Sequence, residues 1–357
     1  MVKDIQIREA GLAHAAQTLP SVVVDDYNIE VKDGDGFIGD RVSKSAFREM
    51  LEACRDSLRA LGPDPLGDKK SCDFSKRRLD QILVADDPLA SGVVFSAIEG
   101  FAQELARVVK IFLNQDGWAG TQAIVVGGGF SDSQVGCLAI GRAGVLLRAG
   151  GIDVTLEPIR HHPDEGGLIG AVHLAPAWMF AGYDSLLAVD IGGSNIRAGV
   201  VTTNLKKAPD LSRSEVWRSE IWRHRDEDPM PSRDEAVDRL IGMLSDLIRR
   251  ADRASFSLAP FIGIGCPGMI EADGTIKRGG QNLPGHWEGD DFNLVERIAA
   301  AIPRIGDHAT MVVMHNDAVV QGLSEVPNRQ DVTRWGVLTI GTGLGNARFT
   351  NRGADEP

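Results

Sequence analysis

Cysteine is scarce and scattered in this sequence. The 357 residues contain four cysteines, and no two of them form a CxxC pair or lie near a histidine cluster; they are Cys54, Cys72, Cys137 and Cys266. This spacing argues against a structural zinc site and against a disulfide framework. The opening stretch MVKDIQIREAG lacks the apolar core of a signal peptide. We therefore expect reduced thiols and a cytoplasmic protein.

Long apolar runs and basic runs are also missing. The most apolar stretch, residues 168–182, is interrupted by His173 and Pro176 and is too short to span a bilayer. The formal net charge is −12, and no basic cluster offsets it. A chain of this charge does not neutralise a phosphate backbone. We expect neither membrane nor nucleic-acid partners.

Glycine is frequent, with 41 residues, and several glycines stand at the ends of short apolar runs. These runs predict strands, and they alternate with helical patterns over residues 45–61, 91–113, 166–175 and 232–253. The last of these opens with Ser232 and Glu235, a capping box. Residues 62–78 are polar and predict a loop or insertion. The alternation predicts an α/β fold, and the length suits two lobes.

Two segments share one plan, an apolar strand, a glycine turn with a hydroxyl residue, and a second extended segment. They are LAVDIGGSNIRAGVV, residues 187–201, and GVLTIGTGLGNARFT, residues 336–350. In a Rossmann or P-loop motif the glycine turn opens a helix, whereas here a strand follows. Both segments therefore predict β-hairpins. Backbone N–H groups in such turns hold anions, and glycine lets phosphate approach closely.

The chemistry-bearing residues each have two interpretations. Asp190 is either a turn-forming acid or, with both hairpins present, a carboxylate that holds Mg²⁺ through water beside a triphosphate. Asp317 is either the N-cap of the helix that follows it or a general base at a strand end. The glycine triplet at 127–129 forms a tight turn or a nucleotide contact. The residues alone leave these alternatives open.

Taken together, these motifs resemble the ROK family of sugar kinases in the actin/hexokinase-like ATPase superfamily. VDIGGSNIRAG resembles its first phosphate motif, with Ser194 where threonine is commoner. GIGCPGMIEADGTI with GGQNLPGHW resembles its sugar-lobe segment, HNDAVVQGLSE its catalytic segment, and LTIGTGLGNA its second phosphate hairpin. The four occur in family order over residues 186–350.

The order of the remaining segments departs from the family. Its first phosphate motif normally opens the chain, but residues 1–185 precede it here and resemble what should follow. Residues 86–113 resemble its late helix, AIVVGGGFSDSQ its adenosine turn, and EGGLIGAVHLA its closing helix. We interpret this as a circular permutation, joined through APAWMFAGYDS, although a shifted fragment of a longer protein would give the same order.

The resemblance implies a two-lobed, circularly permuted α/β fold of the actin/hexokinase (ribonuclease H-like) type. The larger lobe would comprise residues 1–164 and 318–357 and the smaller lobe residues 165–317, with ATP and Mg²⁺ between them. The activity implied is phosphorylation of a glucose-like hexose, with a nucleotide and a sugar as ligands. Dimers are frequent in the family, so a homodimer is also an expectation.

The resemblance also assigns the site residues. Asp317 would be the general base, and Asp190 would hold Mg²⁺ through water. The phosphates would be bound by Asp190, Gly192, Gly193, Ser194, Asn195, Gly341, Thr342 and Gly343, and adenosine by Gly127, Gly128 and Gly129. The sugar would be bound by Gly268, Asn282 and Asn316.

Two departures from the family matter. Its zinc-binding cysteine cluster is absent, so no structural zinc is expected. Its Glu-x-Gly-His sugar motif is absent in standard form, and EAGLAH offers only Glu9 and His14 at a longer spacing. A catalytically degenerate sugar or nucleotide sensor is therefore the alternative. The phosphoryl donor, whether ATP, another nucleotide or polyphosphate, stays open, and a nicotinamide-dependent enzyme has only glycine clusters in its favour.

Overall fold

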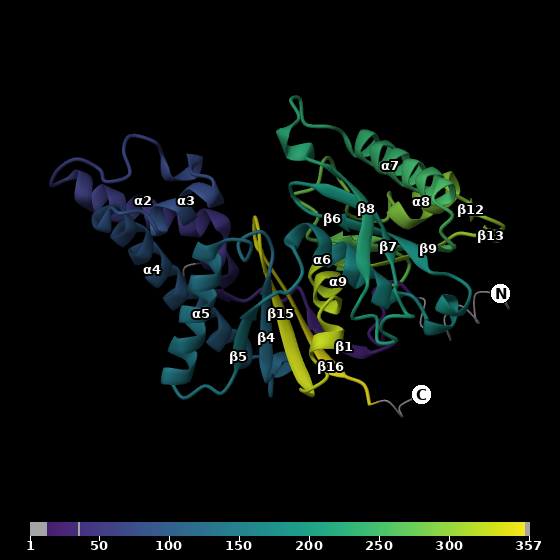
Figure 1. Cartoon of the computed structure of the whole chain (residues 1–357), viewed down its shortest axis with the longest axis horizontal. Coiled ribbons are helices and arrows are strands. Elements are labelled where there is room, and N and C mark those ends of the chain that lie inside the picture. The colour runs from purple at the N-terminus through teal and green to yellow at the C-terminus, as the bar shows by residue number, and fades with distance from the viewer. Residues whose placement is uncertain (1–12, 35, 354–357) are drawn as a thin grey trace. The chain divides into compact units, whose positions relative to one another are not determined.

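The chain forms two compact units in the computed structural model, which describes residues 13–34 and 36–353 (Figure 1). Unit 1 contains, of the described residues, 13–28, 164–333 and 349–353. Unit 2 contains residues 29–163 and 334–348. Each unit is built on strands and helices in alternation, which confirms the predicted α/β class. None of the described helices combines the length and the apolar character that a membrane crossing requires.

Unit 1 is centred on a five-stranded sheet with the order β14-β9-β6-β7-β8. Its strands are β6 (Ser185–Ile191), β7 (Ile196–Thr202), β8 (Glu215–Trp222), β9 (Leu258–Cys266) and β14 (Met311–Asn316). β6, β7 and β8 are antiparallel neighbours, whereas β9 runs parallel to both β6 and β14. The carboxyl ends of β6, β9 and β14 therefore meet at one edge of the sheet.

Helices cover both faces of this sheet. On one face, α7 (Arg233–Arg253) and α8 (Leu294–Ala301) pack with the alternate residues Leu187 and Val189 of β6. On the other lie α6 (Pro163–Gly170), the 3-10 turn η4 (Ala171–Leu174) and α9 (Asp317–Leu323). Side chains alternate between the faces of a strand, so β6 and β9 are buried on both sides.

Helix α7 confirms the predicted capping box. The Ser232 hydroxyl accepts from the Glu235 N–H, and the Glu235 carboxylate accepts from the Ser232 N–H. The predicted stripe is buried at Val237, Leu240, Leu244 and Leu247, while Ile241 and Ile248 are partly buried. Two orphan N–H groups of the first turn are thereby satisfied.

Helix α6 crosses α9 at a glycine. A Cβ on Gly170 would lie 1.7 Å from the carbonyl oxygen of Val320 in α9. Gly265 of β9 also faces Val320 and the Cα of Asp317. These contacts place residues 317–333 in unit 1, where the lobe boundaries expected from the sequence assign residues from 318 onward to the other lobe.

The N-terminal segment belongs to unit 1 by its hydrogen bonds. The N–H of Ala15 donates to the Met314 carbonyl oxygen (2.9 Å). Farther along, Thr350 Oγ1 donates to Asp25 of β1 (Val22–Tyr27) over 2.8 Å. The smaller elements of this unit are η5 (Ala177–Ala181), η6 (His224–Asp226), β10 (Met269–Ile270), β11 (Ile276–Arg278), β12 (Arg304–Ile305), β13 (His308–Ala309) and η7 (Val326–Asn328).

Unit 2 is built on strands in the order β16-β15-β4-β5. These are β4 (Ala123–Gly127), β5 (Thr155–Pro158), β15 (Arg334–Ile340) and β16 (Leu344–Asn351), and β15, β4 and β5 run parallel. The last residues of β16 lie in unit 1, where β1 is the neighbouring strand of the same sheet. The helices are α2 (Lys44–Arg59), α3 (Lys76–Leu83), α4 (Pro88–Leu113) and α5 (Gln134–Ala149). Short elements complete the unit, β2 (Lys32–Asp33), β3 (Gly36–Phe37), η1 (Ile38–Val42), η2 (Ser71–Asp73) and η3 (Asp116–Trp118).

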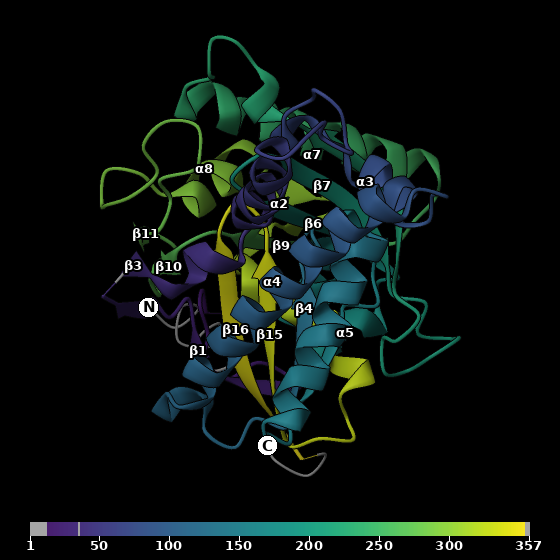
Figure 2. The same cartoon turned by 90° about the vertical axis from the view of Figure 1, so that its left-hand side faces the viewer.

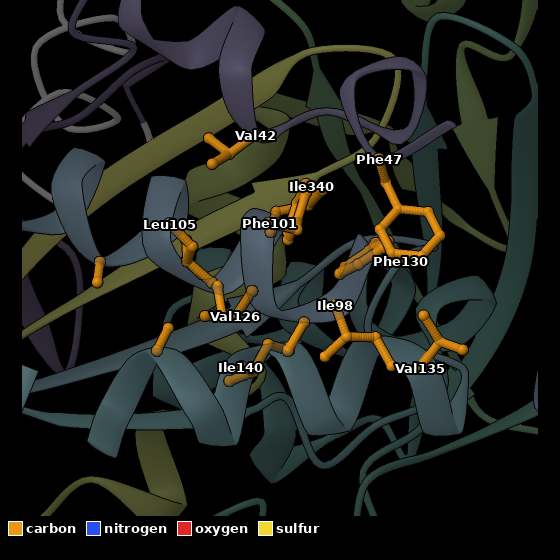
Figure 3. Close-up of a cluster of buried hydrophobic side chains, with 14 of the residues drawn as sticks. Val42, Phe47, Ile98, Phe101, Leu105, Val126, Phe130, Val135, Ile140 and Ile340 are labelled. Carbon is orange, nitrogen blue, oxygen red and sulfur yellow. The ribbon is translucent and has the colours of Figure 1, made fainter. Parts of the chain in front are cut away.

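The core of unit 2 lies between α4, α5 and the sheet. Figure 2 shows α4 and α5 side by side, and Figure 3 shows Phe101, Ile98 and Ile140 from these helices around Val126 of β4. Phe47 of α2 and Phe130 close one end, with ring centroids 5.4 Å apart. The predicted helices at 45–61 and 91–113 are α2 and α4, and α4 begins earlier because Asp87 caps it ahead of Pro88.

Candidate functional site

The first predicted hairpin is β6–β7, and its turn is shaped by glycine. The Gly192 N–H donates to the Asn195 carbonyl oxygen over 2.9 Å. A Cβ on Gly193 would lie 2.9 Å from the Cβ of Asn282. The structure thus brings together two stretches that the sequence separates, the turn at 192–195 and the exposed Asn282. Only a residue without a side chain fits at position 193 without displacing Asn282.

Asp190 is the last residue but one of β6, and it pairs with Arg197, which also pairs with Asp164. Arg197 Nη1 lies 3.1 Å from Asp190 Oδ2, and Arg197 Nη2 lies 2.5 Å from Asp164 Oδ1. Gly167 of α6 abuts the carboxylate, because a Cβ there would be 2.7 Å from Asp190 Cγ. Burial raises the pKa of Asp190, and the positive charge of Arg197 opposes that rise. Sequence reasoning singled out Asp190 but missed both of its partners.

The structure separates the two interpretations of Asp317. The N-cap of α9 is the preceding residue, Asn316, whose Oδ1 accepts from the N–H groups of Ala318 (3.0 Å) and Val319 (3.3 Å). Asn316 Nδ2 donates to the Gly268 carbonyl oxygen over 2.9 Å. Asn316 is buried and bonded at both ends of its amide. Asp317 is thereby relieved of capping and stands at the first position of the helix.

Asp317 and Asp190 converge on the end of β9. Asp190 pairs with Gly265 across the sheet, and a Cβ on the same Gly265 would lie 3.5 Å from the Cα of Asp317. Burial raises the pKa of Asp317 to about 7, the negative charge of Asp190 adds to the rise, and the N–H of Ala318 opposes it. Cys266 lies between them, and burial with both negative charges raises its thiol pKa, so this cysteine is unreactive.

Gly268, another predicted site residue, bends the chain just beyond β9. Its φ of +99° is one that L side chains rarely adopt, and a Cβ there would lie 2.3 Å from the Arg278 carbonyl oxygen. Its carbonyl oxygen is the one that accepts from Asn316. Gly268 therefore fixes the strand end around Asn316 and Asp317.

The second predicted hairpin, β15–β16, lies in unit 2 together with the glycine triplet. Gly341 N–H donates to the Gly343 carbonyl oxygen (2.9 Å), which leaves Thr342 exposed at the tip. The turn after β4 packs on the base of this hairpin, because the Phe130 N–H donates to the Ile340 carbonyl oxygen (3.3 Å). Gly128 has φ +81°, and a Cβ there would lie 2.5 Å from the same oxygen. The glycine triplet and the second hairpin are thus neighbours.

A cavity of about 270 Å³ adjoins this turn within unit 2. Its apolar lining comes from Phe47, Leu79, Phe130 and Val135, and its cations are Lys44, Arg48 and Lys76. Lys76 Nζ donates to the Gly129 carbonyl oxygen (3.1 Å), and the Lys44 N–H donates to the Gly341 carbonyl oxygen (3.1 Å). Sequence reasoning missed these cations, because they stand in a helix and a polar insertion with no motif around them.

The residues at the N-terminal end of the candidate site are only partly described. Glu9 lies outside the described residues. His14 Nδ1 accepts from the Met314 N–H (3.2 Å), and the imidazole lies beside the Asp273 turn. Burial lowers the pKa of His14, and the charge of Asp273 opposes this. A contact between His14 and a sugar stays a prediction.

Two carboxylates of the described residues, Asp190 and Asp317, are candidate metal ligands. Among residues 13–34 and 36–353, no group of three or more histidines, cysteines or acids is arranged to hold a metal ion. Asp190 and Asp317 offer two carboxylates at one sheet edge, a donor set that suits a cation keeping most of its water ligands. These residues therefore fit Mg²⁺ bound chiefly through water and phosphate.

Comparison with known proteins bears on the part of the chain that carries both hairpins. The family model that matches covers residues 186–354 and describes the ROK family. Over this range, just under half of the chain, the sequence is similar to the ROK family. Asp190, Asp317 and the second hairpin all lie in this range, whereas α2, α4 and the glycine triplet precede it. No curated protein matches the chain.

Solved structures of ROK proteins are similar over about half of the chain. A ROK hexokinase from Thermus thermophilus is 22% identical over 45% of this chain and 45% of its own, with a TM-score of 0.33. A ROK family glucokinase from Streptomyces griseus, solved with glucose and AMPPNP, is 21% identical over 47% of this chain and 46% of its own, with a TM-score of 0.34. The chain thus spans about half the length of the structures it matches.

Proposed function

We propose that this protein is a hexose kinase that uses Mg²⁺ and ATP, with Asp317 as general base. The observation that carries the proposal is the state of Asp317, which follows the Asn316 cap and faces Asp190 with a pKa raised to about 7. A general base is most effective when its pKa lies near the working pH. The neighbouring hairpin turn at 192–195 supplies the phosphate-binding backbone.

The chemistry follows from this arrangement. A sugar hydroxyl placed beside Asp317 gives up its proton to the carboxylate as its oxygen attacks the terminal phosphorus, and the bond from that phosphorus to the leaving oxygen breaks. Asn282, exposed beside Gly193, is placed to orient the sugar. Asn316 is bonded within the protein, so we assign it the positioning of Asp317 in addition to any sugar contact. Positioning and charge neutralisation supply most of the acceleration in such transfers.

The donor side of the proposal rests on unit 2. The apolar and aromatic cavity walls suit a nucleobase, and Lys44, Arg48 and Lys76 suit the charge of a nucleotide. Gly129 lines that cavity, and the glycines of its turn, with Gly341 and Gly343 of the neighbouring hairpin, supply backbone that phosphate can approach closely. Asp190, with Asp317 nearby, would hold Mg²⁺, which when bound neutralises charge on the phosphates.

We further propose that the chain is a circularly permuted ROK fold. Helix α6, which would close the fold in its usual order, packs on Asp190 of the strand that would open it. Only residues 171–184, which include η4 and η5, separate α6 from β6 in this chain. The segments that the permutation would have separated also lie together. The Arg352 N–H donates to the Ser21 carbonyl oxygen (3.1 Å).

The experiment that tests the function is an ADP-release assay over a panel of hexoses and N-acetylhexosamines, with MgATP as donor. The proposal predicts sugar-dependent ADP release that is greatest for a glucose-like hexose. Binding of sugar or nucleotide without turnover on any member of the panel would favour the degenerate sensor instead, which the missing Glu-x-Gly-His motif supports. Repeating the panel with other nucleotides and polyphosphate identifies the donor.

A further inference from the structure

A short 3-10 turn, η6, contacts the turn of the first hairpin at residues 192–195. His224 Nε2 is 3.0 Å from the Gly192 carbonyl oxygen, and the Arg225 N–H donates to the Ser194 carbonyl oxygen over 3.4 Å. The His224 side chain is buried, with 1% of its surface exposed. Two successive residues of η6 thus hold two carbonyl groups of the turn from the same side.

The contact with the Gly192 carbonyl oxygen determines which nitrogen of the His224 imidazole carries a hydrogen. A carbonyl oxygen only accepts hydrogen bonds, so Nε2 of His224 carries the hydrogen. Within the described residues, the other ring nitrogen, Nδ1, is buried and has no hydrogen-bond partner. Burying a polar atom without a partner costs stability, and an apolar side chain would avoid that cost. The His224 imidazole therefore lowers the stability of the fold relative to an apolar side chain at this position.

η6 directly follows β8, the strand that pairs with β7 of the hairpin. Trp222, the last residue of β8, pairs with Ile196 at the start of β7. Trp222 Nε1 donates to Glu227 Oε1 (3.0 Å), which closes the chain around η6, and the indole ring lies edge-on to His224. His224 is thereby held in register with the turn it contacts.

The peptide group transmits this contact to the other side of the turn. In a planar trans peptide the C=O and the N–H point in opposite directions. Holding the Gly192 carbonyl toward His224 therefore directs the Gly193 N–H away from it, and holding the Ser194 carbonyl does the same for the Asn195 N–H. Those two N–H groups are the ones that an anion on the open side of the hairpin would bind.

We propose that His224 is a positioning residue for the phosphoryl donor, acting through the Gly192 peptide to present the turn's N–H groups to phosphate. This rests on the proposed function, because it assumes that the hairpin binds the donor phosphates. It adds a residue that lies outside the hairpin's own motif. The role requires a hydrogen-bond donor at the Nε2 position and does not require a charge.

The test compares His224→Leu with His224→Gln, since the amide nitrogen of glutamine can replace Nε2–H. We expect His224→Leu to weaken binding of MgATP, measured by calorimetry, by roughly tenfold, the loss of one oriented hydrogen-bonded peptide. His224→Gln should recover most of that affinity, and hexose affinity should change in neither variant. His308→Leu, at an exposed histidine on β13, is the matched control and should bind MgATP as the unmodified protein does.

A second measurement keeps this inference separate from the proposed function. Amide hydrogen exchange of Gly193 and Asn195, followed by NMR without any ligand, should be faster in His224→Leu than in the unmodified protein and restored in His224→Gln. If the unmodified protein binds no MgATP, the proposed function fails, while the exchange rates still report on the positioning. Unchanged exchange and unchanged MgATP affinity in His224→Leu would overturn the inference, as would a glutamine variant no better than leucine.

Discussion

At the scale of single residues, the environment of Asp317 is decided by its neighbours. Asn316 takes the N-cap role that was one of the two interpretations of Asp317, and its side-chain amide donates to the Gly268 carbonyl oxygen. Burial raises the pKa of Asp317 to about 7, and the like charge of Asp190 on β6 adds to the rise, so Asp317 is partly protonated near neutral pH. Asp317 therefore has a higher pKa than an ordinary surface aspartate.

Replacing Asp317 by alanine tests its assigned role. We expect Asp317→Ala to lose hexose phosphorylation by roughly 10²–10⁴-fold, the usual contribution of a general base, with folding and ATP affinity nearly unchanged. The exposed Asp307→Ala is the control and should keep full turnover. A variant that retains more than about a tenth of its turnover would contradict the role of general base.

The raised pKa of Asp317 also predicts how stability depends on pH. The folded protein holds this proton up to a pH of about 7, whereas an unfolded aspartate releases it near pH 4. Between these values the folded state binds more protons, so the Asp317 contribution to stability falls as pH rises through that window. Asp317→Asn should therefore match the unmodified protein near pH 4 and exceed it by about 2 kcal/mol above pH 7, allowing for partial exposure.

Urea unfolding with EDTA present, from pH 4 to pH 8, checks this prediction. EDTA removes divalent cations, which would otherwise favour the ionised carboxylate. A stability difference between Asp317→Asn and the unmodified protein that is constant over this range would contradict it.

The sequence singles out residues that stand in a motif, but it does not show the long-range contacts that set their state. Asp190 and Asp317 stand out in the sequence because each follows an apolar run, yet nothing local shows that Arg197 pairs with Asp190 and also with Asp164. His224 carries no motif at all, because its role comes from a fold-back onto Gly192. Long-range contacts of this kind are absent from periodicity and composition.

At the scale of elements, the crossing of α6 over α9 is set by glycine. Gly170 has no room for a side chain, because its Cβ would fall 1.7 Å from the Val320 carbonyl oxygen. Gly167, one turn earlier in the same helix, leaves room for Asp190. The close approach of α6 thus contributes to placing both acids at the sheet edge.

Alanine substitutions at Gly170 and at Gly242 should change the stability of the protein in opposite directions. Gly170→Ala should destabilise the protein by about 3 kcal/mol or more, because backbone must move to accept the methyl group. Gly242→Ala in α7 has open space and should stabilise it by about 0.5–1 kcal/mol through the entropy of the unfolded chain. Chemical unfolding of the pair measures both effects, and a neutral or stabilising alanine at 170 would contradict the close crossing.

Sequence patterns predicted most elements that lie around this site and missed their exact ends. The hairpin β6–β7 and the capping box of α7 follow from local spacing and are confirmed. Helix α4 starts three residues earlier than its apolar periodicity indicates, because Asp87 and Pro88 extend it. Of the residues predicted as a loop or insertion, 62–78, the last three belong to α3, which begins at Lys76. The buried guanidinium of Arg55 bonds Ser71 and Asp64 and holds this segment against α2.

At the scale of the whole molecule, the order of segments is the feature that most needs an explanation. The first phosphate motif lies in the middle of the chain, and residues 13–28 still pack in the same unit as that motif. Parallel strands impose no chain order on their neighbours, so a permuted sequence can build the same sheet. The lobe boundaries expected from sequence, and the binding of one nucleotide by both hairpins, stay predictions.

A re-cut chain tests the permutation. A gene that begins at Asp184, runs to the present C-terminus, continues through a short glycine-serine linker into the present N-terminus and ends after Ala175 should fold and keep its activity within a few-fold. Segments near the present ends are hydrogen-bonded neighbours, so a linker can join them. Circular dichroism, urea unfolding and ADP release compare the two chains. A re-cut chain that stays unfolded would count against the permuted order.

The central claim is that a phosphoryl group passes from ATP to a sugar hydroxyl beside Asp317. ³¹P NMR of the protein with MgATP and the best hexose of the panel follows that group directly. The account predicts a phosphomonoester resonance that grows as the γ-phosphate resonance falls, with little inorganic phosphate and no product from Asp317→Ala. Release of inorganic phosphate alone, or no change with any hexose although both ligands bind, would contradict it.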